Sequence, residues 1–396
     1  MSRPLRIGII GAGMAGQAHA FGFRNAMMAR SETPISIELD TIADPNLDLA
    51  QSVARRYGFA RATADVDALI ASDVDVISVA LPNFLHSDVL SRVIASGKHV
   101  FAEKPIGRTP EESAALAELA AASPAVTGVG FSFRRLPGLA ALQQAVGHGL
   151  LGEVHTVRAW YNADYAADPS GALTWRYSQE QAGGGALLDI GAHAIDALQF
   201  VAGAISEVSS ATLRTVITER PLAAAGAIGH GGATSSETGP VTNDDIALLT
   251  VALETGAIGQ ITLSRIAIGI PNSLGVEVFG SQGHAHFDSI SSGEFSIFRA
   301  ESGDTAFNGP RRVFTGPAHP YFLDVAAMPG AGVGTGYAEA FVAEIQEFLR
   351  CVLAAAPMDT DFNTALRMMN VVGAALKSSK EGRSVPVNDL VGQPVG

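Results

Sequence analysis

A glycine-rich hexapeptide near the amino terminus constrains the fold of this chain more than any other feature. Gly11-Ala12-Gly13-Met14-Ala15-Gly16 follows a short apolar run over 5–10 and precedes a helical stretch over 14–30. A G-x-G-x-x-G sequence between a strand and a helix is typical of a dinucleotide-binding turn, in which the glycines allow a tight turn, a close approach to the pyrophosphate and close helix–strand packing. The helix start supplies N–H donors for the phosphates. We therefore predict a dinucleotide contact at Gly11, Gly13, Met14, Ala15 and Gly16.

Strands and helices alternate beyond this turn. The pattern predicts buried strands over 35–43, 76–80, 100–102 and 126–131, with helices over 47–57 and 84–96 and from Thr109 onward. Such alternation predicts a doubly wound parallel sheet with right-handed crossovers. It also favours dinucleotide binding over the alternative of an ordinary glycine-rich turn, because the hexapeptide stands at the first of several strand–helix units.

A second domain is predicted after about residue 135. The chain has 396 residues, whereas a single core stops growing at roughly 250–300 residues. We expect a Rossmann domain over 1–135 and a substrate-binding and oligomerisation domain over 136–396. The second domain is expected to carry a large, mainly antiparallel open sheet, because the sequence there predicts a strand over 153–165, then hairpins that join 246–253 to 258–266 and 276–279 to 285–288, and closing helices near 337–353 and 363–377.

One segment of this second domain has no clear strand or helix pattern. Residues 221–242 are rich in Gly, Ala and Ser, and loops of this length are often functional or disordered. We expect a surface loop, with a lid and a disordered segment both left open.

Composition narrows the classes of partner. The net charge is −13 and only 16% of the residues are charged. An acidic chain is a poor partner for nucleic acid and for anionic membranes, and no apolar run is long enough to cross a bilayer. Arg3 and Arg6, before an apolar run ending at Ala18-His19-Ala20, resemble a signal peptide, but we favour a strand and a phosphate loop here. With Cys351 as the only cysteine, no intrachain disulfide is possible, which is compatible with the cytoplasmic location that we expect.

Asp44 ends the second predicted strand and is followed by Pro45. An acid at this place bonds the adenosine ribose hydroxyls and repels a 2′-phosphate, so NAD is favoured over NADP. Its distance from Gly16 exceeds the usual spacing of about 20 residues, and an insertion over 25–34 accounts for the difference. The alternative is that Asp44 only begins an Asp-Pro turn.

The Glu103-Lys104-Pro105 sequence follows the fourth predicted strand. Ligands of open parallel sheets bind at the carboxyl ends of the strands, so Lys104 is a candidate for contact with a ligand. A lysine on the surface of an ordinary loop is the alternative.

Asp189 and His193 are spaced i, i+4 on a helix predicted over 187–201, after Gly183-Gly184-Gly185. Residues at this spacing share one helix face, and an Asp that orients a His makes a general base suited to neutral pH. A salt-bridged structural helix and a metal site that includes Asp196 are the alternatives. We expect no metal here.

Together these motifs resemble the glucose-fructose oxidoreductase, inositol dehydrogenase and rhizopine-catabolism family, over nearly the whole chain. The resemblance rests on the hexapeptide, Pro82-Asn83 with His86, Gly97-Lys98-His99, Glu103-Lys104-Pro105, and Gly184-Gly185-Ala186-Leu187 leading to Asp189 and His193. It implies a catalytic role for Lys104, Asp189 and His193. It places Pro82, Asn83, His86 and Glu103 in the cofactor crevice, and Trp175-Arg176 near the nicotinamide.

The substrate side of the resemblance is less complete. Ser132 stands where the family often has an asparagine near the substrate. We expect a substrate pocket that includes Lys104, Ser132, Arg134, Tyr165, Trp175, Asp189 and His193.

A narrower resemblance is to the levoglucosan dehydrogenase-like branch of this family. It rests on four segments, Ala167-Asp168-Pro169, Leu173-Thr174-Trp175-Arg176, Glu219-Arg220-Pro221-Leu222 and Thr315-Gly316-Pro317-Ala318-His319-Pro320-Tyr321. It implies an NAD-dependent oxidation of a ring hydroxyl of a sugar, an anhydrosugar or a polyol. A glycosidase that oxidises its sugar transiently with NAD, an enzyme that never releases its cofactor, and a non-enzymatic NAD-sensing regulator are the alternatives.

Two further expectations concern surfaces. An aromatic stretch before the Asp–His helix suits the apolar face of a sugar ring or the core; it comprises Trp160, Tyr161, Tyr165, Trp175 and Tyr177. The residues over 261–263 and 266–268 look apolar on both faces of the sheet. Because monomers rarely expose large apolar patches, we predict a homodimer or a homotetramer built through this sheet.

Overall fold

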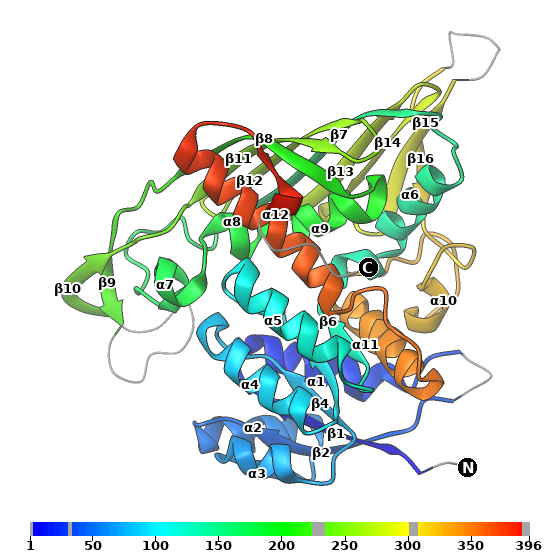
Figure 1. The fold of residues 1–396 in the computed structure, drawn as a ribbon. Coiled ribbons are helices and arrows are strands. Elements are labelled where there is room, and N and C mark those ends of the chain that lie inside the picture. Colours follow the sequence, from blue (N-terminus) through cyan, green and yellow to red (C-terminus); the bar gives the residue numbers. More distant parts are fainter. Residues whose placement is uncertain (1–2, 31–33, 224–233, 301–307, 390–396) are drawn as a thin grey trace. The chain divides into compact units, whose positions relative to one another are not determined.

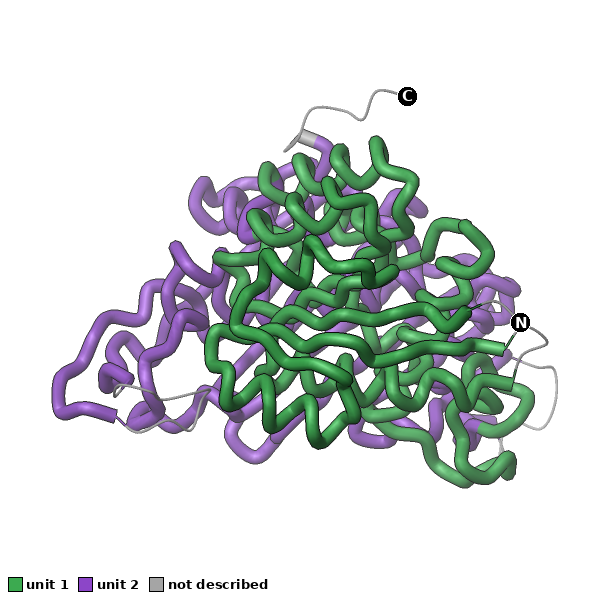
Figure 2. The backbone as a smooth tube through the Cα atoms, turned by 90° about the horizontal axis from the view of Figure 1, so that it is seen from below, with its two compact units in different colours: residues 1–107, 111–136, 316–367 green, residues 108–110, 137–315, 368–396 purple. Residues whose placement is uncertain are grey.

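The computed structural model of this chain describes residues 3–30, 34–223, 234–300 and 308–389. The chain forms two compact units, one of residues 1–107, 111–136 and 316–367 and one of residues 108–110, 137–315 and 368–396 (Figure 2). These units differ from the expected ranges 1–135 and 136–396, because the segment 316–367 belongs to the first unit.

The first unit holds a parallel six-stranded sheet in the order β3-β2-β1-β4-β5-β6 (Figure 1). The strands are β1 (Leu5–Ile10), β2 (Ile37–Ala43), β3 (Arg61–Thr63), β4 (Val76–Val79), β5 (His99–Ala102) and β6 (Thr127–Val129). The helices between them are α1 (Met14–Ala26), α2 (Leu47–Tyr57), α3 (Val66–Ala71), α4 (Asn83–Ala95) and α5 (Pro110–Ala121). The doubly wound fold predicted from the sequence is therefore confirmed, with β3 and α3 as the elements that the sequence did not indicate.

Helix α11 (Tyr337–Ala354) explains why a late segment belongs to the first unit. Its residues Ile345 and Phe348 are fully buried in the same apolar cluster as Phe23 of α1. The side-chain amide of Gln346 also donates to the carbonyl oxygen of Ala26 over 3.3 Å. An apolar helix face must be buried against another element, and here that element lies more than 300 residues earlier in the chain.

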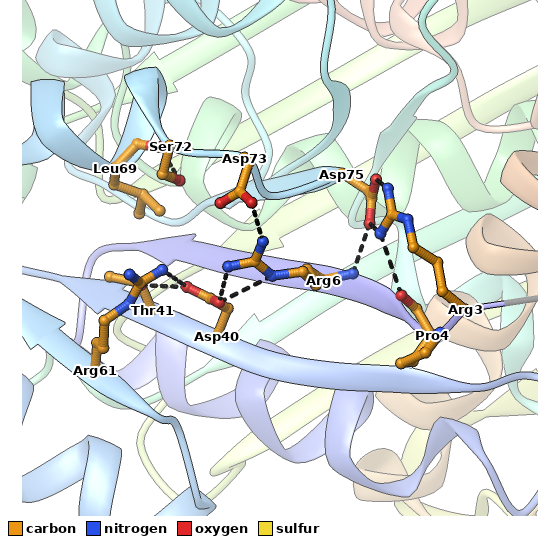
Figure 3. Close-up of polar contacts among 10 residues, drawn as sticks. All are labelled: Arg3, Pro4, Arg6, Asp40, Thr41, Arg61, Leu69, Ser72, Asp73 and Asp75. Carbon is orange, nitrogen blue, oxygen red and sulfur yellow. Dashed lines mark hydrogen bonds and ion pairs between the residues drawn. The ribbon is translucent and has the colours of Figure 1, made fainter.

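An ion-pair network crosses the strands of this sheet (Figure 3). Arg6 on β1 donates to Asp40 of β2 over 2.6 Å and also pairs with Asp73. Arg61 pairs with the other oxygen of Asp40, and Arg3 bonds Asp75, just before β4, over 2.6 and 2.7 Å. Arg3 and Arg6, which resemble the basic start of a signal peptide in the sequence, thus form ion pairs that connect strands of the parallel sheet.

The second unit is built on a nine-stranded sheet in the order β16-β15-β14-β13-β7-β12-β11-β8-β17. The strands are β7 (Val154–Ala163), β8 (Ile205–Arg214), β11 (Ile246–Leu253), β12 (Ile258–Ser264), β13 (Asn272–Gly280), β14 (Gly283–Asp288), β15 (Glu294–Arg299), β16 (Arg311–Phe314) and β17 (Val385–Pro386). Both predicted hairpins, β11–β12 and β13–β14, are present. The sheet is mixed because β7 and β12 run parallel, and its other pairs are antiparallel, as predicted.

Helices α6 (Pro137–Gly147) and α9 (Gly191–Ala202) pack against this sheet. Leu263 of β12 lies against Gly191, and Phe287 of β14 lies against Gly138. The remaining long helix, α12 (Phe362–Glu381), divides its residues between the two units.

The opposite face of the sheet is more polar than the sequence suggested. On β12, Ile261 and Leu263 are both buried, whereas Thr262 between them is exposed. The expectation of two apolar faces at 261–263 is therefore wrong, because both apolar side chains point to the helix-covered face. Ile268, which is 84% exposed, lies beyond the end of β12.

The segment 221–242 is not one continuous loop. Strands β9 (Glu219–Ala223) and β10 (Thr234–Pro240) pair in an antiparallel ribbon. Residues 224–233 lie outside the described part of the chain, and the expectation of a lid or a disordered segment falls on them. Of the helices in the described ranges, no single one is long and apolar enough to cross a membrane; the bent pair 179–189 and 191–202 meets that criterion only when its two parts are joined.

Candidate active site

The glycine-rich turn has the geometry that a bound pyrophosphate requires. Gly11 has a φ of +102°, and a Cβ on it would lie 2.2 Å from the carbonyl oxygen of Ala80 after β4. A Cβ on Gly16 would lie 1.8 Å from the carbonyl oxygen of Gly11, so helix α1 packs closely on β1. A Cβ on Gly13 would meet nothing within 4 Å, which leaves the backbone there open to a ligand. The N-cap Gly13 offers no side-chain cap to α1, so the N–H groups of Met14 and Ala15 face no competing side-chain acceptor from the cap. These residues fit a dinucleotide.

Asp44 lies directly beside this turn. Its Oδ2 accepts the backbone N–H of Ala12 over 2.8 Å, and its Oδ1 accepts the N–H of Asn46 over 2.9 Å. Asp44 therefore both closes the turn that starts α2 and carries a negative charge next to the phosphate loop. The two interpretations of Asp44 from the sequence are not exclusive.

Two buried histidines hold the Glu103-Lys104-Pro105 turn. The Nε2 atom of His86 accepts the N–H of Leu81 over 3.3 Å, and its Nδ1 lies 2.6 Å from the carbonyl oxygen of Pro105. Since Nε2 accepts, the ring proton is on Nδ1, and burial lowers the pKa of His86, which keeps the ring neutral. His86 thereby joins the end of β4 to the residue after Lys104.

His19 of α1 contacts this turn from the other direction. Its ring nitrogens lie 2.7 Å from Oγ of Ser78 and 3.2 Å from Oε1 of Glu103. The second carboxylate oxygen of Glu103 accepts the backbone N–H of Lys104 over 3.0 Å. The turn that carries Lys104 is thus tied to β4 and to α1, whereas the sequence alone left open an ordinary surface loop.

The other first-unit residues expected at the site lie at the start of α4 and in a 3-10 turn. Pro82 is the N-cap of α4 and Asn83 its first residue, so both stand at the carboxyl end of β4. Ser132 and Arg134 lie in the 3-10 turn η1 (Ser132–Arg135) and are 1% and 8% exposed. The neighbouring Arg135 is fully buried, where it donates to the hydroxyl of Tyr321 over 2.6 Å and pairs with Asp359.

Asp189 and His193 do not share a continuous helix. Asp189 is the last residue of α8 (Ala186–Asp189), and His193 lies in the first turn of α9 (Gly191–Ala202). The chain bends by 44° between 179–189 and 191–202. The continuous helix predicted over 187–201 is therefore wrong, because it breaks at Ile190. The i, i+4 spacing alone no longer places the two side chains on one face, and their joint role stays a prediction.

Two tyrosines lie beside this pair. Tyr161 is on strand β7, and Tyr165 is in the segment that follows this strand. The Tyr165 hydroxyl donates to Oδ2 of Asp189 over 2.7 Å, and burial raises the pKa of Tyr165 well above its usual value. The Tyr161 ring centroid lies 6.1 Å from that of His193, which is 6% exposed. Asp189 and His193 thus each have a tyrosine of the second unit as a neighbour.

The aromatic stretch predicted near the substrate divides between different environments. Trp160 points to the sheet face opposite Tyr161, where its indole lies over Gly275 and stacks on His286 with centroids 5.6 Å apart. Tyr177 is buried between the guanidinium groups of Arg220 and Arg265, at 4.2 and 4.8 Å. Trp175 lies under the guanidinium of Arg176 at 4.4 Å. We therefore no longer expect Trp160 or Tyr177 to pack on a sugar.

Sequence reasoning missed a polar cluster that supports this region. Arg265 is fully buried, pairs with Asp245 over 2.9 Å and donates to Oδ1 of Asn243 over 2.9 Å. The Asn243 amide donates to the carbonyl oxygens of Arg176 and Gly184 over 2.8 and 3.1 Å. The signal in the sequence was Asn243-Asp244-Asp245 directly before an apolar strand, since buried polar residues in a row require partners.

The expectation of catalysis without metal concerns Asp189, His193 and Asp196. Among the residues that the structure describes, no three His, Cys, Asp or Glu side chains are grouped to hold a metal ion. Catalysis without metal at Asp189, His193 and Asp196 stays a prediction.

Comparison with known proteins places these features in a family. Residues 5–131 match the description "Oxidoreductase family, NAD-binding Rossmann fold", and residues 139–286 match "GFO/IDH/MocA C-terminal domain". The chain is 33% identical to levoglucosan dehydrogenase of Pseudarthrobacter phenanthrenivorans over 98% of its length and 99% of that protein. It is 26% identical to inositol 2-dehydrogenase of Rhizobium meliloti over 97% and 99% of the two chains.

Solved structures of levoglucosan dehydrogenase have the same fold as this chain. Levoglucosan dehydrogenase in complex with NADH and L-sorbose superposes with a TM-score of 0.91 at 32% identity, covering 98% of this chain and 99% of that one. The same enzyme with NADH and levoglucosan gives a TM-score of 0.90 at 31% identity, over 97% of this chain and all of that one. This chain belongs to the glucose-fructose oxidoreductase, inositol dehydrogenase and rhizopine-catabolism family and is an NAD-binding oxidoreductase.

Proposed function

We propose that this protein oxidises a ring hydroxyl of a sugar, an anhydrosugar or a polyol with NAD. The observation that carries the proposal is the full-length similarity to levoglucosan dehydrogenase. The same chain has Lys104 on a turn tied to β4 and α1, and Asp189 shortly before His193 in the sequence. NAD, when bound, accepts the hydride, since no side chain can do so. The finer choice among levoglucosan-like anhydrosugars, simple sugars and polyols rests on the named relatives. Because Ser132 replaces an asparagine that the family often has near the substrate, this choice is left to the substrate screen.

The catalytic roles follow from the chemistry of the three side chains. We assign His193 as the base that removes the hydroxyl proton while the carbon loses hydride. Lys104 donates a hydrogen bond that stabilises the developing alkoxide charge. Asp189 orients His193 and stabilises its protonated ring. Neither the base nor the alkoxide stabiliser requires a metal ion, so activity is expected to survive chelators, and elemental analysis is expected to find no stoichiometric zinc.

The cofactor roles follow from the first unit. We propose that Gly11, Gly13, Met14, Ala15 and Gly16 bind the pyrophosphate, and that Asp44 bonds the adenosine ribose. Pro82 and Asn83 stand at the carboxyl end of β4, next to the point where the strand order of the sheet reverses between β1 and β4. Such a switch point is where open α/β sheets bind ligands. His86 and Glu103 are assigned to holding the crevice, and Trp175 with Arg176 to its nicotinamide end.

A screen of sugars, anhydrosugars and polyols with NAD tests the activity. The expected result is NADH formation with at least one cyclic substrate. Release of sugar from a glycoside without net NADH would instead identify the NAD-dependent glycosidase. A nicotinamide absorbance that stays with the purified protein would identify an enzyme that retains its cofactor. No turnover, with NAD bound tightly, would favour the regulator.

Variants at His193 test the site itself. His193→Ala is expected to lower kcat and kcat/KM together by on the order of 10²–10⁴, because proton removal occurs in the transition state. NAD binding should be retained. His148→Ala, which alters an exposed histidine beyond the end of α6, is the matched control. If His193→Ala keeps near-normal turnover, the site lies elsewhere.

A further inference from the structure

Asp244 accepts hydrogen bonds from three successive backbone N–H groups, those of residues 185–187. Its carboxylate accepts the N–H of Gly185 over 2.9 Å and that of Leu187 over 2.7 Å. Its own carbonyl oxygen accepts the N–H of Ala186 over 2.8 Å. Asp244 is 4% exposed, so all three hydrogen bonds are shielded from water, where an unpaired donor is costly.

The contact leaves no room for a side chain at residue 185. A Cβ on Gly185 would lie 1.9 Å from the carbonyl oxygen of Asp244. The glycine is thus required by the close approach of the two backbones. Asn243 adds a fourth link, because its amide donates to the carbonyl oxygen of Gly184 over 3.1 Å.

This anchored segment leads directly to Asp189. The backbone N–H of Asp189 donates to the carbonyl oxygen of Gly185 over 2.8 Å. Gly185 is therefore held by Asp244 through its N–H and holds Asp189 through its carbonyl. From the side-chain end, Asp189 is held by the Tyr165 hydroxyl. The position of the Asp189 carboxylate is determined at both ends by groups outside α8.

We propose that Asp244 is a positioning residue for catalysis: it fixes the backbone over 185–187 and thereby the direction in which Asp189 presents its carboxylate to His193. This inference rests on the proposed function, in which Asp189 orients the base. A misplacement of about 1 Å in such a group costs on the order of 10²-fold in rate. Asp244 touches neither substrate nor cofactor in this assignment.

Hydrogen exchange tests the anchoring without any activity measurement. In Asp244→Asn, one carboxylate oxygen is replaced by an NH₂ group, which cannot accept an N–H. The amides over 185–187 are expected to exchange at least tenfold faster than in the unmodified protein, while those of β1 and β4 in the first unit keep their rates. Unchanged exchange over 185–187 would overturn the proposal.

Asp288→Asn is the matched control. Asp288 also accepts a backbone N–H, that of Ile290 over 2.9 Å, but it lies at the end of β14 and outside the 185–189 segment. It is expected to leave exchange over 185–187 and turnover unchanged. If Asp244→Asn does not fold, exchange in the unmodified protein decides: amides over 185–187 that exchange as fast as exposed loop amides would overturn the anchoring.

A double-mutant cycle tests the path through Asp189. Asp244→Asn alone is expected to lower kcat by roughly 10–100-fold. NAD affinity should not change, because Asp244 bonds residues 185–187 and none of these is assigned to the cofactor. In an Asp189→Asn background the same change is expected to cost less than about threefold, since coupled residues are not additive. If the kcat loss of the double variant equals the product of the two single losses, Asp244 does not act through Asp189, and the positioning role is overturned.

The two proposals fail in different ways. If Asp189→Asn itself leaves turnover unchanged, or if no sugar or polyol is oxidised, the proposed function fails and with it the catalytic meaning of Asp244. The exchange result would still establish whether Asp244 holds the segment.

Discussion

The hydroxyl group of Tyr165 donates a hydrogen bond to Oδ2 of Asp189 across 2.7 Å. Burial raises the pKa of Tyr165 well above its usual value, so the phenol keeps its proton at neutral pH and remains a donor. One carboxylate oxygen of Asp189 is therefore engaged by Tyr165, which holds the carboxylate that we assign to orient the base. Tyr165, which the sequence suggested as a substrate contact, has a partner inside the protein.

We predict that Tyr165→Phe lowers kcat by roughly tenfold. The variant removes one hydrogen bond to a charged group, which is worth about 1.5–3 kcal/mol, and leaves the ring in place. NAD affinity, measured by calorimetry, should not change. Tyr57→Phe, on α2 of the first unit, is the control. A rise in substrate KM at unchanged kcat would show instead that Tyr165 binds substrate uniformly and does not orient Asp189.

Asp44 is predicted to determine the choice of cofactor. NAD should bind more tightly than NADP, because the carboxylate next to the Ala12 N–H repels a 2′-phosphate. Asp44→Ala should weaken NAD by roughly tenfold or more, the equivalent of a lost charge-assisted hydrogen bond, and narrow the difference between the two cofactors. Asp48→Ala, which removes a carboxylate from the first turn of α2, should not. Tighter binding of NADP by the unmodified protein would contradict this role.

The neutral ring of His86 is predicted to support both cofactor and catalysis. His86→Ala removes the two hydrogen bonds that join Leu81 to Pro105. These bonds connect the segment before α4 to the turn that carries Lys104. NAD affinity and kcat should each fall by roughly tenfold, about the worth of one to two buried hydrogen bonds. His155→Ala, at an exposed position on β7, should affect neither. If both quantities stay unchanged, the turn is held by His19 and Glu103 alone.

Acid stability is predicted to depend on Asp40. Burial favours the neutral acid, but hydrogen bonds from Thr41, Arg61 and Arg6 lower its pKa from the usual 3.8 to about 2. A carboxyl group with a depressed pKa stabilises the folded state above the unfolded pKa, and this contribution is lost as the pH falls through the folded one. Asp40→Asn should lower the free energy of unfolding at pH 7 by about 2 kcal/mol.

The pH dependence provides the check. The difference between Asp40→Asn and the unmodified protein, from denaturant unfolding, should shrink as the pH falls from about 4 towards 2. Asp65→Asn, at the N-cap of α3, serves as a control at an exposed carboxylate. A difference that stays constant over this range would mean that packing, and not charge, is lost in the variant.

Assembly through the open face of the large sheet stays a prediction. Leu248 and Ile258 on β11 and β12 are 47% and 58% exposed, on the face opposite the buried Ile261. We expect a homodimer or a homotetramer by light scattering, and Ile258→Asp should shift it to a smaller species. Leu119→Asp, at a 41% exposed position on α5, should not. A monomer at micromolar concentration would refute this assembly.

The sequence alone determined the features that depend on residues near one another in the chain. The dinucleotide turn, its glycines and α2 with Gly58 at its end, where φ is +83°, follow from local rules for turns and helix caps. The family also followed from the sequence, because its motifs are short and each is contiguous. The family-based identification and the NAD-binding fold are both confirmed by the comparisons.

Only the tertiary structure decided the features that depend on residues far apart. Periodicity predicted one helix through Asp189 and His193, and the break at Ile190 was not visible in it. Trp160 and Tyr161 are neighbours in sequence, but a strand sends successive side chains to opposite faces, and which face meets α9 depends on the whole sheet. Asp244 and Gly185 are 59 residues apart. Their contact exists because the folded core removes water from the Gly185 N–H and leaves the Asp244 carboxylate as its hydrogen-bond acceptor.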